Sequence, residues 1–257
     1  MSFNMLRSLD PTRPITTLTI FRFPKKQAWW AFAQMGLRVL QNPVGALFSK
    51  MLGNGRNGFG ILPDFQQYTF LASWENTAQA DAFFNSTTFQ NYVSRTSEYY
   101  TVKMVPLQSH GQWDGMEPFS GKEGAELDAN GPLIVLTRAK INFTKLFDFW
   151  RHVRTAHASL RSSKGVMLAL GIGENPITQQ ATISVWDSVA SLRKFAYQQA
   201  GHKEIVKRTR QRRWYKEELF ARFVPVATQG TLNGKDVLER FIMPTLVNNR
   251  NADNLYI

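Results

Sequence analysis

None of the 257 residues is a cysteine. This absence excludes disulfides, thiolate metal sites, haem-thiolate ligation and a cysteine nucleophile. The sequence also lacks any apolar run near the roughly 20 residues that a membrane-spanning helix needs. Its first residues carry Arg7, Asp10 and Arg13 and show no signal-peptide pattern. We therefore expect a cytoplasmic protein.

Acidic residues are scarce, with 19 against 31 lysines and arginines, which gives a net charge of +12. Nine of the basic residues lie between Arg193 and Lys216. Such a stretch suits nucleic acid, an anionic lipid surface or an acidic protein, and it is equally typical of a solvated helix face. Binding of single strands needs exposed aromatic residues interleaved with the charges, and we expect only Trp214 and Tyr215 to supply them. We expect no nucleic-acid partner, and a basic nucleic-acid-binding module is the less favoured alternative.

The sequence contains an internal repeat. Residues 66–74 resemble residues 179–186, and each run ends in a tryptophan followed by an acidic residue and a helical pattern. Each copy predicts the order strand, helix, strand, strand, helix, strand, which is that of a ferredoxin-like unit. The predicted fold class is α+β, with two ferredoxin-like βαββαβ halves packed as a pseudo-dimeric α/β barrel. The predicted parts are half 1 at 14–119, a linker at 120–131, half 2 at 132–235 and a C-terminal tail at 236–257.

Hydrophobic periodicity places the expected elements. In the first copy we expect strands at 15–23, 59–62, 68–74 and 101–107, helices at 29–40 and 77–96, and a helical stretch at 44–52. In the second copy we expect strands at 133–141, 166–171, 181–186 and 219–226, and helices at 144–160 and 189–215. The sequence Gly53–Gly58 reads GxGxxG, but it precedes a predicted strand rather than a helix, so a mobile loop is favoured over a nucleotide site.

Among the four histidines, His202 differs from the rest because it corresponds to Phe89 in the first copy. A ring nitrogen in one copy only would suit a single cofactor site, since neutral imidazole is a standard ligand of haem iron. A surface histidine on a basic helix is the alternative. His152 and His157 lie five residues apart on a predicted helix, so they cannot readily share a metal. His110 is expected in an exposed loop.

Arg138 and Arg222 interrupt two predicted strands of the second copy. An arginine that points into the barrel could pair with a haem carboxylate or polarise a bound oxygen. An arginine on the other face would be an ordinary solvated charge. Both readings stay open at this point.

Several long segments resemble the spheroidene monooxygenase family, in order and with similar spacing over about residues 15–235. They are Thr19–Phe23, Gly111–Phe119, Leu136–Ala139, Gly171–Trp186 and Glu218–Phe223. The resemblance implies a haem-dependent monooxygenase that inserts oxygen, as hydroxyl and then keto group, into a large apolar, carotenoid-like substrate. Its cofactor would be haem b, with dioxygen as co-substrate.

The resemblance also implies residue roles, because the family has His or Arg at the positions of His157, His202, Arg138 and Arg222. His202 would be the axial ligand of the iron, with His157 as the runner-up. Arg222 would bind the cofactor, and Arg138 would be catalytic by stabilising negative charge that develops on oxygen. A cofactor-free binding or oxygenase barrel of the same fold is the alternative.

The resemblance has consequences for partners. No nicotinamide or flavin motif is present, so electrons would come from an external donor such as ferredoxin. The basic stretch 193–216 would dock that donor or contact the inner membrane surface from the cytoplasmic side. Monomer and oligomer both stay open.

Overall fold

The computed structural model describes residues 2–37, 39–40, 42–60, 62–119, 128–198 and 214–244. Its first part contains β1 (Asn4–Met5), β2 (Ile15–Arg22), the short helix η1 (Lys25–Gln27), α1 (Ala28–Leu37), β3 (Ala46–Gly55), β4 (Pro63–Trp74), α2 (Thr77–Phe84), α3 (Thr87–Arg95) and β5 (Glu98–Gly111). Its second part contains β6 (Leu133–Ile141), η2 (Phe143–Lys145), α4 (Leu146–Arg161), β7 (Val166–Asn175), β8 (Gln179–Trp186), α5 (Val189–Gln198), β9 (Tyr215–Gly230) and η3 (Glu239–Phe241).

The strands form one antiparallel sheet in the order β1-β9-β5-β2-β4-β3-β7-β8-β6, and β6 pairs again with β9. Eight strands therefore close into a barrel, with β1 attached beside β9. Each half supplies four neighbouring strands. The halves are joined by the pairs β5–β9 and β3–β7. The α+β barrel predicted from the repeat is confirmed.

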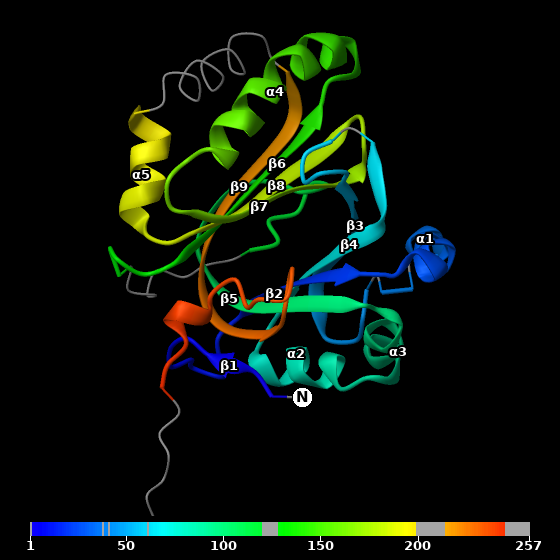
Figure 1. The fold of residues 1–257 in the computed structure, drawn as a ribbon, viewed down its shortest axis with the longest axis vertical. Helices are drawn as coiled ribbons and strands as arrows, with labels where there is room; N and C mark the ends of the chain where they lie inside the picture. Colours follow the sequence, from blue (N-terminus) through cyan, green and yellow to red (C-terminus); the bar gives the residue numbers. More distant parts are fainter. Residues whose placement is uncertain are drawn as a thin grey trace, which may run out of the picture.

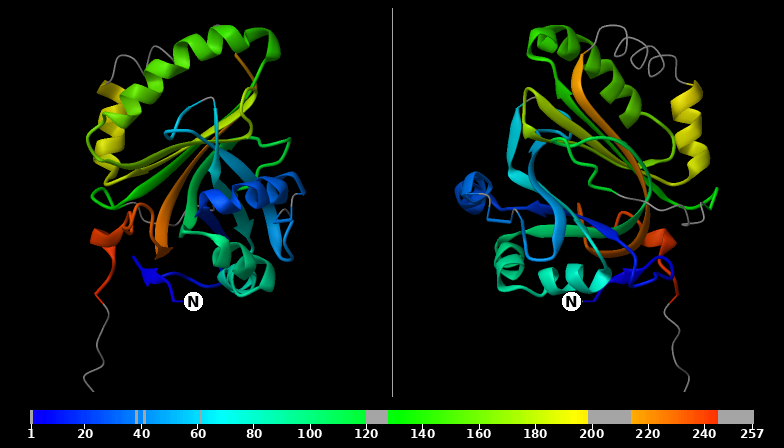
Figure 2. Two further views of the ribbon diagram at one scale, coloured as in Figure 1. Left: turned by 45° about the vertical axis from the view of Figure 1, so that its right-hand side comes forward. Right: turned by 180° about the vertical axis from the view of Figure 1, so that it is seen from behind.

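Helices cover the outside of the barrel on opposite sides (Figures 1 and 2). The helices α2 and α3 lie against the strands of the first half, and α4 and α5 lie on the side of the second half. The helix α1 stands out from the side of the barrel. None of the helices in the described ranges is long and apolar enough to cross a bilayer.

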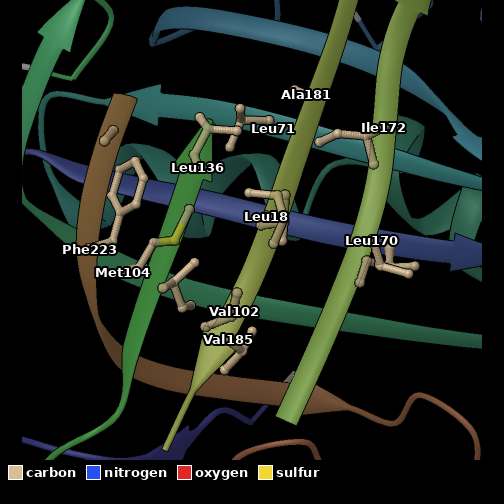
Figure 3. Packing of buried hydrophobic residues seen from close by; sticks show 14 of the residues in the cluster. Leu18, Leu71, Val102, Met104, Leu136, Leu170, Ile172, Ala181, Val185 and Phe223 are labelled. Atoms are coloured by element: carbon tan, nitrogen blue, oxygen red, sulfur yellow. The ribbon is translucent and has the colours of Figure 1, made fainter. Parts of the chain in front are cut away.

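Apolar side chains from both halves fill the barrel interior. The strands of the two halves cross there, and residues such as Leu18, Leu71, Leu136, Ile172 and Phe223 meet between them (Figure 3). A second core packs the outer face of the first half against its helices, and a third does so for the second half. The strands of these halves thus have apolar residues on both faces. Their sequences therefore lack the alternation of apolar and polar residues that is typical of a half-buried strand.

That double burial explains the main error in the predicted elements. Residues 44–52 were expected to be helical, but most of them belong to strand β3. Phe48 and Leu52 point into the barrel core while Met51 packs with the outer core, so apolar residues recur at helix-like spacing. The predicted strand at 59–62 is also wrong, because Phe59 and Gly60 lie in the turn between β3 and β4.

Two predicted helices differ in extent. The helix expected at 77–96 is interrupted at Asn85 and Ser86, where the Ser86 side chain accepts a hydrogen bond from the Phe89 amide and starts a new helix. Of the helix expected at 189–215, α5 accounts for 189–198 and Tyr215 already begins β9. Residues 199–213 lie outside the described residues.

Candidate active site

Arg138 lies on the face of β6 that points into the barrel. Leu136, two residues earlier, belongs to the barrel core, and alternation places Arg138 on the same face. Only 1% of its side chain is exposed. Of the two readings open from the sequence, the inward-pointing one holds for this arginine.

Arg138 belongs to a group of six charged residues at one end of the barrel interior, which we call the charge cluster. Its guanidinium forms ion pairs with Glu217, with Asp114 at 3.3 Å and with Glu174 at 3.7 Å. The cluster consists of Lys50 of β3, Asp114 of the loop after β5, Arg138 and Lys140 of β6, Glu174 of β7 and Glu217 of β9. Three cations thus face three carboxylates, so the charges of the cluster are balanced.

The loop that carries Asp114 covers this end of the barrel. Lys50 Nζ lies 2.6 Å from Asp114 and 2.9 Å from Glu174, and Trp113 Nε1 donates to Glu174 at 2.7 Å. The Arg138 guanidinium lies over the Trp113 ring, 5.1 Å from its centre. The amides of Asp114 and Gly115 both donate to Glu217. Residues from five parts of the chain are therefore held together by one network.

The cluster shifts the acidity of its members. Burial alone would raise the pKa of Asp114, but the hydrogen bond from Lys50 and the nearby cations lower it below its usual value. Burial is likewise outweighed at Glu217, where the amides of Asp114 and Gly115 and the Arg138 guanidinium lower the pKa. The carboxylates around Lys50 raise its pKa in spite of burial.

Acid is expected to weaken the fold through this cluster. A carboxyl whose pKa is lower in the folded than in the unfolded state stabilises the fold when it is ionised. This stabilisation is complete above the unfolded pKa, which is 3.8 for Asp114 and 4.5 for Glu217. It is lost as the pH falls through the lower pKa of the folded state. The free energy of unfolding, measured in urea between about pH 6 and 3, should fall less steeply in Glu217→Gln than in the wild type. Equal slopes in both proteins would contradict this assignment.

Arg222 lies on the opposite face of the sheet. On β9 the core residues Ala221 and Phe223 point into the barrel, so Arg222 between them points outward, on the side of α4 and α5. It is half-buried, and its Nε has no hydrogen-bond partner within the described ranges. Its guanidinium lies 5.2 Å from the ring centre of Phe220. The structure therefore does not bring Arg138 and Arg222 together.

The matching position in the first half shows what Arg222 lacks. In the first half, Thr17 of β2 pairs with Lys103 of β5, and in the second half the equivalent Val135 of β6 pairs with Arg222 of β9. Lys103 is therefore the counterpart of Arg222. Lys103 is buried and forms an ion pair with Asp81 of α2. The residue of α5 that corresponds to Asp81 is Arg193. Thus the buried cation of the first half has an acidic partner, whereas the residue at the matching sequence position of the second half is an exposed cation.

The outer face of the second half also carries smaller side chains. The strand registers match Phe21 with Ala139 and Phe70 with Thr182. Both phenylalanines are fully buried under the helices of the first half. Thr137 is exposed, although its counterpart Thr19 is completely buried. Among the described residues, the outer face of the second half therefore carries smaller side chains than the matched face of the first half.

These features fit haem on the outer face of the second half. A large flat cofactor needs space next to apolar residues, and its carboxylates need a cation such as Arg222, whose Nε has no partner among the described residues. His202, the predicted axial ligand, lies outside the described residues. His157 is part of α4, and its side chain is not described. His110 is exposed as expected, but it belongs to β5 rather than to a loop.

The sequence analysis missed most of the charge cluster. It singled out Arg138 but none of the three carboxylates that hold it. A signal was available, because Lys50, Glu174 and Glu217 are charged residues at inward-facing positions of strands, the last two near a strand end. The misassignment of β3 as a helix removed Lys50 from that pattern, and only the tertiary structure brings the Asp114 loop to the same place.

The GxGxxG segment forms the tip of the β3–β4 hairpin rather than a nucleotide site. Gly55 and Gly58 are bridged across the turn, and no helix begins there, so the motif lacks the helix N-terminus that a pyrophosphate needs. The Gly58 carbonyl accepts a hydrogen bond from the amide of Gly171 on β7, and Phe59 packs against the outer core of the second half. The loop of one half therefore contributes to the outer layer of the other.

Comparison with known proteins agrees with this architecture. A family model described as "Domain of unknown function (DUF3291)" matches residues 143–224. The chain is 36% identical to spheroidene monooxygenase of Cereibacter sphaeroides over 230 residues, covering 86% of this chain and 69% of the relative. It is 31% identical to spheroidene monooxygenase of Rhodobacter capsulatus, covering 88% of this chain and 95% of the relative.

Solved structures share the fold at much lower identity. A crystal structure of aldoxime dehydratase aligns with a TM-score of 0.55 at 11% identity, covering 88% of this chain and 87% of that chain. Another, in complex with butyraldoxime, aligns with a TM-score of 0.59 at 11% identity, covering 91% and 87%. These likenesses concern the fold alone.

Proposed function

This chain belongs to the spheroidene monooxygenase family, and we propose that it is a haem-dependent monooxygenase acting on a large apolar, carotenoid-like substrate. The product would carry a hydroxyl and then a keto group. The proposed reaction type rests on the sequence identity to monooxygenases over most of the chain. The proposed location of the cofactor rests on Arg222, whose Nε has no partner among the described residues, and on the smaller side chains of the same face.

In this proposal the second half, 132–235, holds the single active site and the first half, 14–119, supports it. His202 would bind the iron through an imidazole nitrogen, and His157 is the second choice. Arg222 would hold a haem carboxylate through its guanidinium. When bound, the haem supplies activation of dioxygen, which no side chain of this sequence provides.

The side chains of this half would orient the substrate and keep water away from it. Val135, Leu160 and Phe195 belong to the apolar core of the outer layer, which suits a hydrocarbon chain and repels water. Two successive hydroxylations at one carbon followed by loss of water would yield the ketone. The electrons would come from an external donor such as ferredoxin, docked on the basic stretch 193–216, most of which lies outside the described residues.

The role of Arg138 in stabilising negative charge stays a prediction. Its position inside the barrel, on the other face of the sheet from the proposed haem and within ion-pair distance of three carboxylates, favours a role in holding the barrel together. The two roles predict different behaviour of an Arg138 variant, namely lost activity at normal stability or lost stability.

Production of a keto carotenoid is the expected result when this chain is expressed aerobically, with haem available, in a bacterium that accumulates acyclic carotenoids. Chromatography with mass spectrometry would show a product that has gained one oxygen and lost two hydrogens, and the purified protein would be red with a Soret band. A colourless protein that still forms the product would favour the cofactor-free barrel. Unchanged carotenoids beside a folded, haem-loaded protein and an active ferredoxin system would contradict the proposed substrate class.

A further inference from the structure

The helix α1 carries an apolar stripe on its outward side. Trp29, Phe32, Ala33 and Gly36 recur at the spacing of one helix face, and all four are exposed. The exposed fraction of Trp29 is 83%. None of the ten residues of this helix is charged. An outward helix face normally carries polar residues, so this one departs from the usual pattern.

The inward side of the same helix is packed in the ordinary way. Trp30 contacts Phe23 and Tyr92, and the Arg95 guanidinium lies 4.7 Å from its ring centre. Ala31 is buried in the core of the first half. The helix is therefore already anchored to its own barrel by one apolar side, and the outward stripe is not needed for that purpose.

The exposed apolar surface continues beyond the helix. Phe32 contacts the exposed Phe65 at the start of β4, with ring centres 5.6 Å apart. Leu62, three residues before Phe65, and Leu37, at the end of α1, are also exposed. We call the surface formed by Trp29, Phe32, Leu37, Leu62 and Phe65 the α1 patch. Figure 1 shows α1 at the outer margin of the molecule, beside the strands of the first half.

The charges next to the α1 patch are mainly positive. Lys25 and Lys26 are exposed on η1, immediately before the helix. Arg56 is exposed, and its amide donates to the carbonyl of Leu62. The nearby acid is Asp64, which is half-buried and accepts a hydrogen bond from the Gln66 amide.

We propose that the α1 patch docks the protein on the surface of an anionic phospholipid bilayer. Trp29, Phe32 and Leu37 would enter the boundary between headgroups and acyl chains, and Lys25, Lys26 and Arg56 would contact anionic headgroups. A second copy of this chain fits less well, because a symmetric contact would press two patches of the same positive charge together. This surface differs from the basic stretch 193–216, and it would place the protein where an apolar lipid substrate dissolves.

Sedimentation with lipid vesicles tests the proposal. The wild type should bind vesicles that contain phosphatidylglycerol far better than vesicles of phosphatidylcholine alone. Trp29→Ser combined with Phe32→Ser should lower the partition coefficient about tenfold or more, because two large apolar side chains no longer enter the lipid. Lys25→Gln combined with Lys26→Gln should lower binding to anionic vesicles by roughly fivefold per lysine and leave neutral vesicles unaffected.

Phe147→Ser is the matched control. Phe147 occupies the corresponding position on α4 and is 84% exposed, but its helix also carries charged residues such as Asp148 and Arg151. Equal loss of vesicle binding in Phe147→Ser and in the α1 variants would overturn the proposal. So would unchanged binding in the α1 variants, or a change confined to their oligomeric state in gel filtration. Substrate and cofactor are not needed in this assay, so its outcome is separate from that of the proposed reaction.

Discussion

Replacing Arg138 with methionine is expected to lower the free energy of unfolding by about 3–5 kcal/mol. The side chain is almost completely buried, and its loss would leave Glu217 without a cation among the described residues, while Asp114 and Glu174 would keep Lys50. Methionine keeps much of the volume, so the expected loss comes from the uncompensated Glu217 carboxylate rather than from a cavity. Urea denaturation followed by circular dichroism would measure it.

Lys140→Met provides the matched comparison. Lys140 belongs to the same cluster, but its side chain is 39% exposed and lies 3.7 Å from Asp114. Its replacement should cost less than about 1 kcal/mol. Adding Glu217→Gln to Arg138→Met should recover part of the lost stability, because a buried unpaired charge is removed. An Arg138→Met protein of normal stability that has lost oxygenation would instead support the catalytic role.

Loss of the Soret band is the result expected for His202→Ala. If His202 is the axial ligand, its removal should weaken haem binding by about 100-fold or more, since even outer partners of metal ligands are worth roughly 10–100-fold. Titration of the purified apoprotein with haem, followed by absorption, gives the affinity directly. Arg222→Met should keep the ligand-dependent spectrum but weaken binding by roughly tenfold, the contribution expected of one charged hydrogen bond.

Two further histidine variants complete this test. His157→Ala should retain the Soret band and the affinity, and a loss there but not in His202→Ala would assign the ligand to α4. His110→Ala, exposed on β5, should change neither. Wild-type affinity in all three proteins would mean that none of these histidines holds haem.

The repeat predicted the architecture because it left matching residues in both halves. Trp74 and Trp186 are both fully buried, and each packs against a phenylalanine of the following helix, Phe83 or Phe195, at the same centre distance of 5.2 Å. Local patterns located β2, β4 and β5 of the first half and all four barrel strands of the second half. They failed at β3, where burial on both faces imitates helical spacing.

The site was harder to predict than the fold. Arg138 and Arg222 were both selected as interruptions of apolar strands, yet their faces depend on strand register, and they lie on opposite sides of the sheet. Which of them has acidic partners depends on residues brought from other strands and from the loop at Asp114. The difference between Lys103 with Asp81 and Arg222 with Arg193 became visible only when the registers of the two halves were compared.

Closure of the barrel has a kinetic consequence. The β5–β9 pairing joins residues as far apart in sequence as Tyr100 and Gly230. Such distant pairing slows folding, because a long loop must be closed before the contact stabilises anything. During synthesis, the apolar inner face of the first-half strands stays uncovered until β9 has been made and can pair with β5. We therefore expect slow refolding and a need for chaperone protection of the nascent chain, even though the finished barrel leaves few strand edges free.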